Sequence, residues 1–114
     1  MSARQEVLLH LIRLDQPVSV TARQLAQFPW DSAQGLVTLD RSNIEEALTR
    51  FIRQELGALE LEEWANLIEG RDDIEIADDL SRRAIFELAN PAISASLNGQ
   101  RARLLIEALH GPAK

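Results

Sequence analysis

Apolar residues that recur with a helical period are the feature that most constrains this chain. The clearest apolar stripe follows Ser42 and consists of Ile44, Ala47, Leu48, Phe51, Ile52 and Leu56. A repeat of 3.6 residues per turn gathers such positions on one side of a helix. Ser42 and Glu45 have the spacing of a capping box, and Gly57 stands where a glycine commonly ends a helix. The pattern therefore predicts an amphipathic helix between Ser42 and Gly57.

The same period recurs in five further segments, which are bounded by cap residues, prolines or glycines. We expect these helices to span roughly residues 2–14, 21–28, 60–69, 75–89 and 98–110. Residues 36–39 have some strand propensity, but an isolated strand has no partner, so we expect an extended connector there. The prediction is an all-α fold, a compact bundle or orthogonal array of about six short helices, forming a single domain over residues 1–114.

Several classes of protein are disfavoured by what the sequence lacks. A chain of 114 residues without cysteine forms no disulfide and no thiolate metal site, and this composition fits a reducing cytoplasm. The first residues show no signal-peptide pattern, and no apolar run is long enough for a membrane span. We therefore expect a cytoplasmic protein without membrane contact.

Catalytic and nucleic-acid-binding signals are also missing. The net charge of −6 is opposite to that of a typical nucleic-acid binder. The sequence has no glycine-rich phosphate loop, no nucleophile elbow and no zinc-ligand spacing. Its two histidines, His10 and His110, stand at opposite ends of the chain, where a boundary role and a helix-end role explain them. We expect a protein without catalytic residues, metal or cofactor.

One acidic stretch carries most of the negative charge. Nine carboxylates are opposed only by Arg71, and they are Glu60, Glu62, Glu63, Glu69, Asp72, Asp73, Glu75, Asp78 and Asp79. A solvated surface with acids in the first turns of two helices explains this stretch without a ligand. A calcium site is a second interpretation, although the order of residues is not that of an EF-hand. A negative patch that binds a basic protein is the third.

The third interpretation gives a set of candidate contact residues. A patch of this kind mainly speeds association, so tight binding also needs a buried anchor. Trp64 lies on an apolar stripe and is expected in the core. Trp30 follows a proline in a loop, and we expect its ring to fold back on the core as a lid; it becomes an anchor only if the ring is exposed. The candidate partner-binding residues are Glu69, Asp72, Asp73, Glu75, Asp78, Asp79 and Trp30.

Three strings in the sequence carry a resemblance to a group of proteins. They are residues 61–74 (Leu-Glu-Glu-Trp-Ala-Asn-Leu-Ile-Glu-Gly-Arg-Asp-Asp-Ile), residues 28–31 (Phe-Pro-Trp-Asp) and residues 87–91 (Glu-Leu-Ala-Asn-Pro). These strings resemble a pattern in small bacterial helical proteins that are similar to colicin-type and contact-dependent-inhibition immunity proteins in size, acidity and helical content. The resemblance implies a bacterial protein without enzymatic activity that neutralises a cognate toxin.

Two functional hypotheses follow. The first is an immunity protein that binds the basic surface of a toxin domain through the acidic patch. The second is a structural or regulatory helical module, for example a homodimer, in which the acidity serves solubility alone. Charge reversal at Asp72 and Asp73 separates them, because it slows association only under the first hypothesis.

Overall fold

The computed structural model describes residues 2–92 and 96–111 of the chain. Within these ranges it contains six α-helices and two short strands. In chain order these are α1 (Ala3–Arg13), α2 (Val18–Leu25), β1 (Val37–Leu39), α3 (Arg41–Ile52), α4 (Ala58–Ile68), β2 (Ile74–Ile76), α5 (Asp79–Ala89) and α6 (Gly99–Leu109). The predicted all-α class and the number of helices are confirmed.

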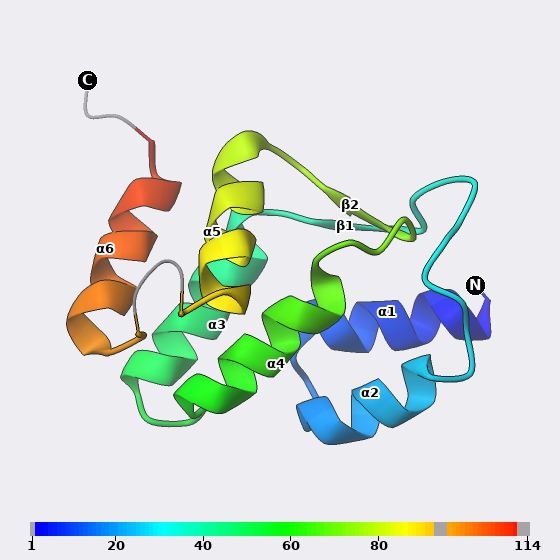
Figure 1. Ribbon diagram of the computed structural model, residues 1–114, viewed down its shortest axis with the longest axis horizontal. Helices are drawn as coiled ribbons and strands as arrows, with labels where there is room; N and C mark the ends of the chain where they lie inside the picture. The colour runs from blue at the N-terminus through cyan, green and yellow to red at the C-terminus, as the bar shows by residue number, and fades with distance from the viewer. Residues whose placement is uncertain (1, 93–95, 112–114) are drawn as a thin grey trace.

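The helices form two groups that α4 connects. In Figure 1, α1 and α2 lie side by side at one end, while α3, α5 and α6 form the other end. Helix α4 packs against α5 in one group and against α2 in the other. None of the helices in the described ranges is both long and apolar enough to cross a membrane.

Trp64 is the largest fully buried side chain and joins α4 to α1. It has no exposed surface, and its indole Nε1 donates a hydrogen bond to the carbonyl oxygen of Leu11 at 2.7 Å. Buried indole N–H groups usually need such a partner. The core position expected for Trp64 is confirmed, and its hydrogen bond connects α4 to α1.

Residues 36–39 are extended, as expected, but the expectation that they have no strand partner is wrong. Strand β1 pairs in parallel with β2, and Val37 lies opposite Ile74. The chain between the two strands contains α3 and α4, so the pairing joins segments far apart in sequence. Because residues 74–76 form a strand, the fifth helix begins at Asp79 and not at Glu75.

Helix boundaries also differ from the predicted ones at three caps. Asp40, not Ser42, is the N-cap of α3 and forms a capping box with Asn43. Helix α2 begins at Val18 after Pro17, a residue suited to a helix start, and not at Thr21. Gly57 precedes α4 as its N-cap and does not end α3. The helix starts predicted at residues 2 and 98 are confirmed, because Ser2 and Asn98 are the N-caps of α1 and α6.

Candidate functional site

Asp73 lies between α4 and β2 and is completely buried, with 0% of its surface exposed. Arg71 holds both carboxylate oxygens, with Nε 2.9 Å from Oδ1 and Nη2 3.1 Å from Oδ2. Arg4, from the first turn of α1, donates from Nε to Oδ2 at 2.9 Å. One buried carboxylate therefore accepts from two arginines, and the expectation that Asp73 belongs to a surface patch is wrong.

The two arginines also decide the ionisation of Asp73. Burial alone would raise the pKa of this carboxyl, because a charged group loses its hydration. Hydrogen bonds from Arg71 and Arg4, and the positive charges of both, outweigh burial and hold the pKa below its ordinary value. Asp73 is therefore an anion in the folded protein at neutral pH.

The backbone of residues 29–31 is bound to this buried cluster. Arg4 Nη2 donates to the carbonyl oxygens of Pro29 and Asp31, each at 2.9 Å. The carbonyl oxygen of Trp30, between them, accepts from the backbone N–H of Asp72 at 3.1 Å. Three consecutive carbonyl groups of a surface loop thus have partners from α1 and from the segment before β2.

Trp30 is the side chain that this loop presents. Its residue is 46% exposed, and the Arg71 guanidinium carbon lies 4.6 Å from the centroid of its ring. A guanidinium over an indole face gives a favourable cation–π contact. Arg71 therefore supports one face of the Trp30 ring, and the residue remains nearly half exposed to solvent. The expectation that Trp30 folds back on the core as a lid is wrong, and the condition set for a binding anchor is met.

A shallow apolar hollow lies beside Trp30, between α2 and α4. It has a volume of about 310 Å³ and is lined by Val18, Ala22, Trp30, Glu63, Asn66 and Leu67. Two exposed carboxylates, Asp31 and Asp72, belong to the loop and to the segment bonded to it. We call Trp30, this hollow and the carboxylates of Asp31, Glu63 and Asp72 the Trp30 site.

The remaining predicted contact residues do not gather at the Trp30 site. Asp78 is the N-cap of α5, bonds the N–H of Ser81 and pairs with Arg41 at 2.9 Å. The hydrogen bond from Ser81, with help from Arg41, lowers the pKa of Asp78. Asp79 pairs with Arg82, and Glu69 accepts from Asn90. These carboxylates have local roles in the fold.

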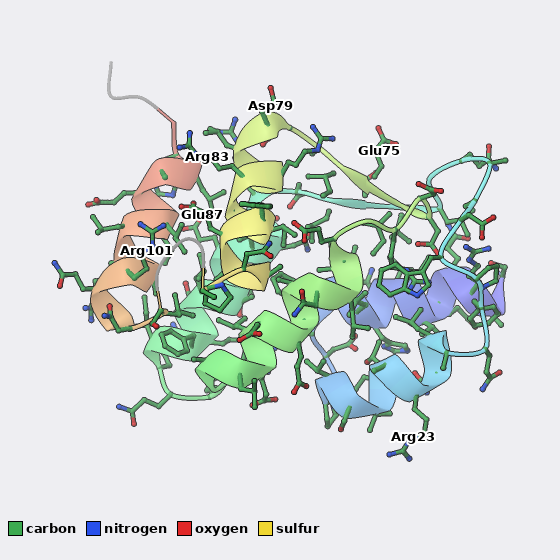
Figure 2. All side chains as sticks on the ribbon, viewed as in Figure 1. Arg23, Glu75, Asp79, Arg83, Glu87 and Arg101 are labelled. Carbon is green, nitrogen blue, oxygen red and sulfur yellow. The ribbon has the colours of Figure 1, made fainter. Side chains whose placement is uncertain are left out.

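Glu75 is the exception among the residues of the β2 region. It is exposed, and in Figure 2 it points away from the body of the molecule. It makes no ion pair within the described ranges. Its Cβ lies 3.1 Å from the position that a Cβ on Gly35 would occupy, so the β2 region packs closely against the loop after Trp30.

No three histidine or carboxylate side chains of the described residues come together in a way that could hold a metal ion. Each of the two histidines faces one carboxylate. His10 Nδ1 lies 2.7 Å from Asp15 Oδ1, and His110 Nε2 lies 3.3 Å from Glu45 Oε1. Both pairs are exposed. Each histidine is therefore accounted for by a surface pair at a helix end.

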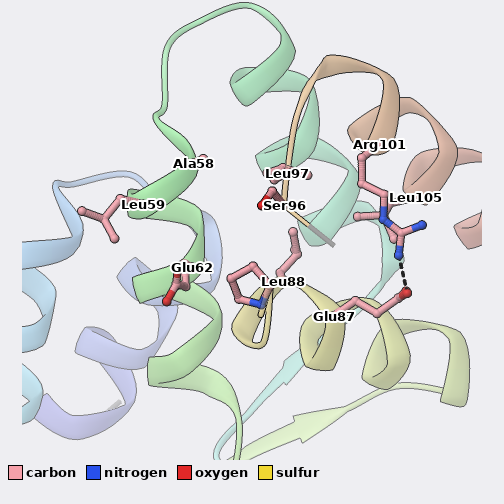
Figure 3. A pocket seen from close by; sticks show the side chains of 10 residues that line it. Ala58, Leu59, Glu62, Glu87, Leu88, Ser96, Leu97, Arg101 and Leu105 are labelled. Atoms are coloured by element: carbon pink, nitrogen blue, oxygen red, sulfur yellow. Dashed lines mark hydrogen bonds and ion pairs between the residues drawn. The ribbon is translucent and has the colours of Figure 1, made fainter. Parts of the chain in front are cut away.

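A second hollow, of about 210 Å³, lies among α4, α5 and α6 (Figure 3). Leu59, Leu88 and Leu105 contribute apolar surface, and the Arg101–Glu87 ion pair lies on one side of it. Two of its charged groups are thus paired with each other, and Glu62 also lines this hollow.

Sequence reasoning missed the roles of Arg4 and Arg71. Arg71 and Asp73 are two residues apart, a spacing that puts side chains on one side of an extended segment, so their pairing had a local signal. Arg4 had none, because it meets Asp73 across 69 positions of sequence.

Comparison of the chain with protein-family models, with curated proteins and with solved structures found no match.

Proposed function

We propose that this protein is a non-enzymatic binding domain that recognises a basic protein surface through the Trp30 site. In its most specific form, the proposal is a cytoplasmic bacterial immunity protein that neutralises a cognate toxin. The observation that carries the proposal is the half-exposed ring of Trp30, which lies over a buried arginine and beside an apolar hollow.

The geometry of Trp30 is that of an interface anchor. Tryptophan is enriched among the few residues that dominate binding energy at protein interfaces, especially next to pockets. Leaving this ring nearly half exposed forgoes hydrophobic stabilisation that burial in the core would give. A partner that covers the ring and fills the hollow with an apolar side chain would recover that stabilisation.

The charges around the ring favour a basic partner. Glu63 lines the hollow, Asp31 follows Trp30 in the loop, and Asp72 bonds to the Trp30 carbonyl group through its backbone N–H. None of the three makes an ion pair within the described ranges. Carboxylates at the edge of an interface attract lysine and arginine side chains during association. Nuclease toxins have basic clefts for phosphate groups, and carboxylates can occupy the same positions. No cofactor is needed for this function.

Co-production with the product of the neighbouring upstream gene tests the proposal. We expect the two proteins to elute together at moderate salt, and we expect the neighbour to be toxic when produced alone. The Trp30→Ala variant should lose both the complex and the protection. Phe86→Ala is the matched control, because Phe86 is 45% exposed on α5. A neighbour that is neither toxic nor bound would contradict the immunity function.

A homodimeric structural module remains the second candidate, and one surface favours it. Leu104 is 49% exposed on α6 and borders a groove of about 230 Å³ between α5 and α6, with Leu80 and Ala108. A second copy that covered this groove would make a dimer. Light scattering tests this function. A wild-type mass that doubles as concentration rises, together with a monomeric Leu104→Glu variant, would support it. A wild-type protein that is monomeric at all concentrations would exclude it.

A further inference from the structure

The loop that carries Trp30 makes more hydrogen bonds to the rest of the protein than a surface loop needs. Solvent-exposed carbonyl groups normally bond to water, yet those of Pro29, Trp30 and Asp31 all have protein partners. Arg71 adds a longer contact of 3.4 Å from Nη2 to the Pro29 carbonyl oxygen. The bonds converge on the backbone on either side of the exposed ring, so they restrict its orientation.

The anion at the centre of this arrangement is a costly way to stabilise a fold. Two charges that leave water lose hydration, and their attraction often does no more than offset that loss. Apolar residues of similar volume would commonly give equal or greater stability. What the charged cluster gives instead is directional bonding, since each guanidinium has donors in fixed positions.

We infer that Arg4, Arg71 and Asp73 are positioning residues that fix Trp30 in one orientation before a partner arrives. Asp73 orients both guanidinium groups, Arg4 then holds the backbone on both sides of Trp30, and Arg71 supports the face of the ring. A contact group that is ordered beforehand loses less entropy on binding. The consequence for binding rests on the proposed function, whereas the order of the loop does not.

Arg4 offers the sharpest test because lysine cannot reproduce its geometry. Arg4 contacts Asp73 through both Nε and Nη2, and Nη2 also donates to the two carbonyl groups, whereas lysine has a single nitrogen. Its side chain is 18% exposed, so water can reach the site when the residue is shortened. Arg4→Lys keeps the positive charge and the helix propensity, and Arg4→Gln removes the charge. Arg23→Lys is the control, because Arg23 points away from the body of the molecule from α2 (Figure 2).

Two readouts report the loop separately from the rest of the fold. Acrylamide quenching of fluorescence reports access to Trp30, and the Trp30→Phe variant gives the contribution of the buried Trp64 for subtraction. Hydrogen exchange of the Asp72 amide reports the bond to the Trp30 carbonyl. Exchange of the Glu69 amide, which bonds to Ala65 at the end of α4, reports the helix beside it.

We expect Arg4→Lys and Arg4→Gln to increase quenching of Trp30 and to speed exchange at Asp72, while Glu69 and Trp64 keep their wild-type behaviour. Arg23→Lys should change neither readout. Unchanged quenching and exchange in the Arg4 variants would overturn the inference. So would an equal rise at Asp72 and Glu69, because that result assigns Arg4 to global stability. Neither measurement uses a partner, so failure of the proposed function leaves this result intact.

Discussion

The guanidinium carbon of Arg71 lies 4.6 Å from the centre of the Trp30 ring, while its nitrogens hold both oxygens of Asp73. One side chain thus connects a fully buried anion to the half-exposed Trp30. A substitution at Asp73 is therefore expected to change the position of Arg71 and, with it, the support of the Trp30 ring.

Loss of the buried anion should destabilise the protein strongly. Asp73→Asn leaves Arg71 buried without its counter-charge, and breaking a buried pair in this way costs about 3–5 kcal/mol. Urea unfolding followed by circular dichroism measures the change. Asp79→Asn is the control, because the Asp79 side chain is fully exposed and, among the residues that the structure describes, pairs only with Arg82 one helical turn away. We expect that control to change stability by less than about 0.5 kcal/mol. Equal effects in the two variants would contradict the structural role of Asp73.

The contribution of Asp73 to stability should depend on pH in the acid range. Its pKa in the folded protein is below the ordinary 3.8, so folding favours the anion. The stabilisation is complete above the ordinary value, declines as pH falls below it, and is lost once pH passes below the lowered pKa. The free energies of unfolding of wild type and Asp73→Asn should therefore differ by a constant amount above about pH 5 and converge in more acidic solution. A difference that grew with acidity would contradict the assigned direction.

Helices were predictable from the sequence because their signals are local. The apolar stripe of Ile44 and Leu48 and the cap at Asn98 lie within one or two turns of the residues that they organise. The boundary errors have the same origin. Asp40–Asn43 and Ser42–Glu45 both have capping-box spacing, and only the three-dimensional path of the chain from β1 selects the first pair.

The strand pair and the site depend on contacts between distant segments. Leu39 and Ile76 pair across two intervening helices, so no periodicity in residues 36–39 reveals the partner. Asp72 and Asp73 are adjacent and chemically identical, yet one is exposed and the other has no exposed surface. Asp73, unlike Asp72, is held by Arg71 and by Arg4, which lies 69 positions away in the sequence. Trp30 and Asp72 were predicted as contact residues, but the hollow beside them was not.

Neutralising the carboxylates of the Trp30 site should slow association with the basic partner. Glu63→Gln combined with Asp72→Asn removes two exposed charges, so the association rate should fall and its dependence on salt should weaken. Stopped-flow fluorescence at several ionic strengths measures both. Glu107→Gln on α6 is the control for a loss of charge elsewhere. If Glu107→Gln slowed association as much as the double variant, net charge rather than the site would steer the partner.

Calorimetric titration of the Trp30→Ala and Phe86→Ala variants with the partner tests the central claim most directly. Truncation of a tryptophan anchor costs at least about 2 kcal/mol of binding free energy, which raises the dissociation constant about 30-fold. We expect that loss for Trp30→Ala while its circular dichroism spectrum shows a folded protein, and wild-type affinity for Phe86→Ala. Wild-type affinity in Trp30→Ala, with the fold intact, would contradict the account.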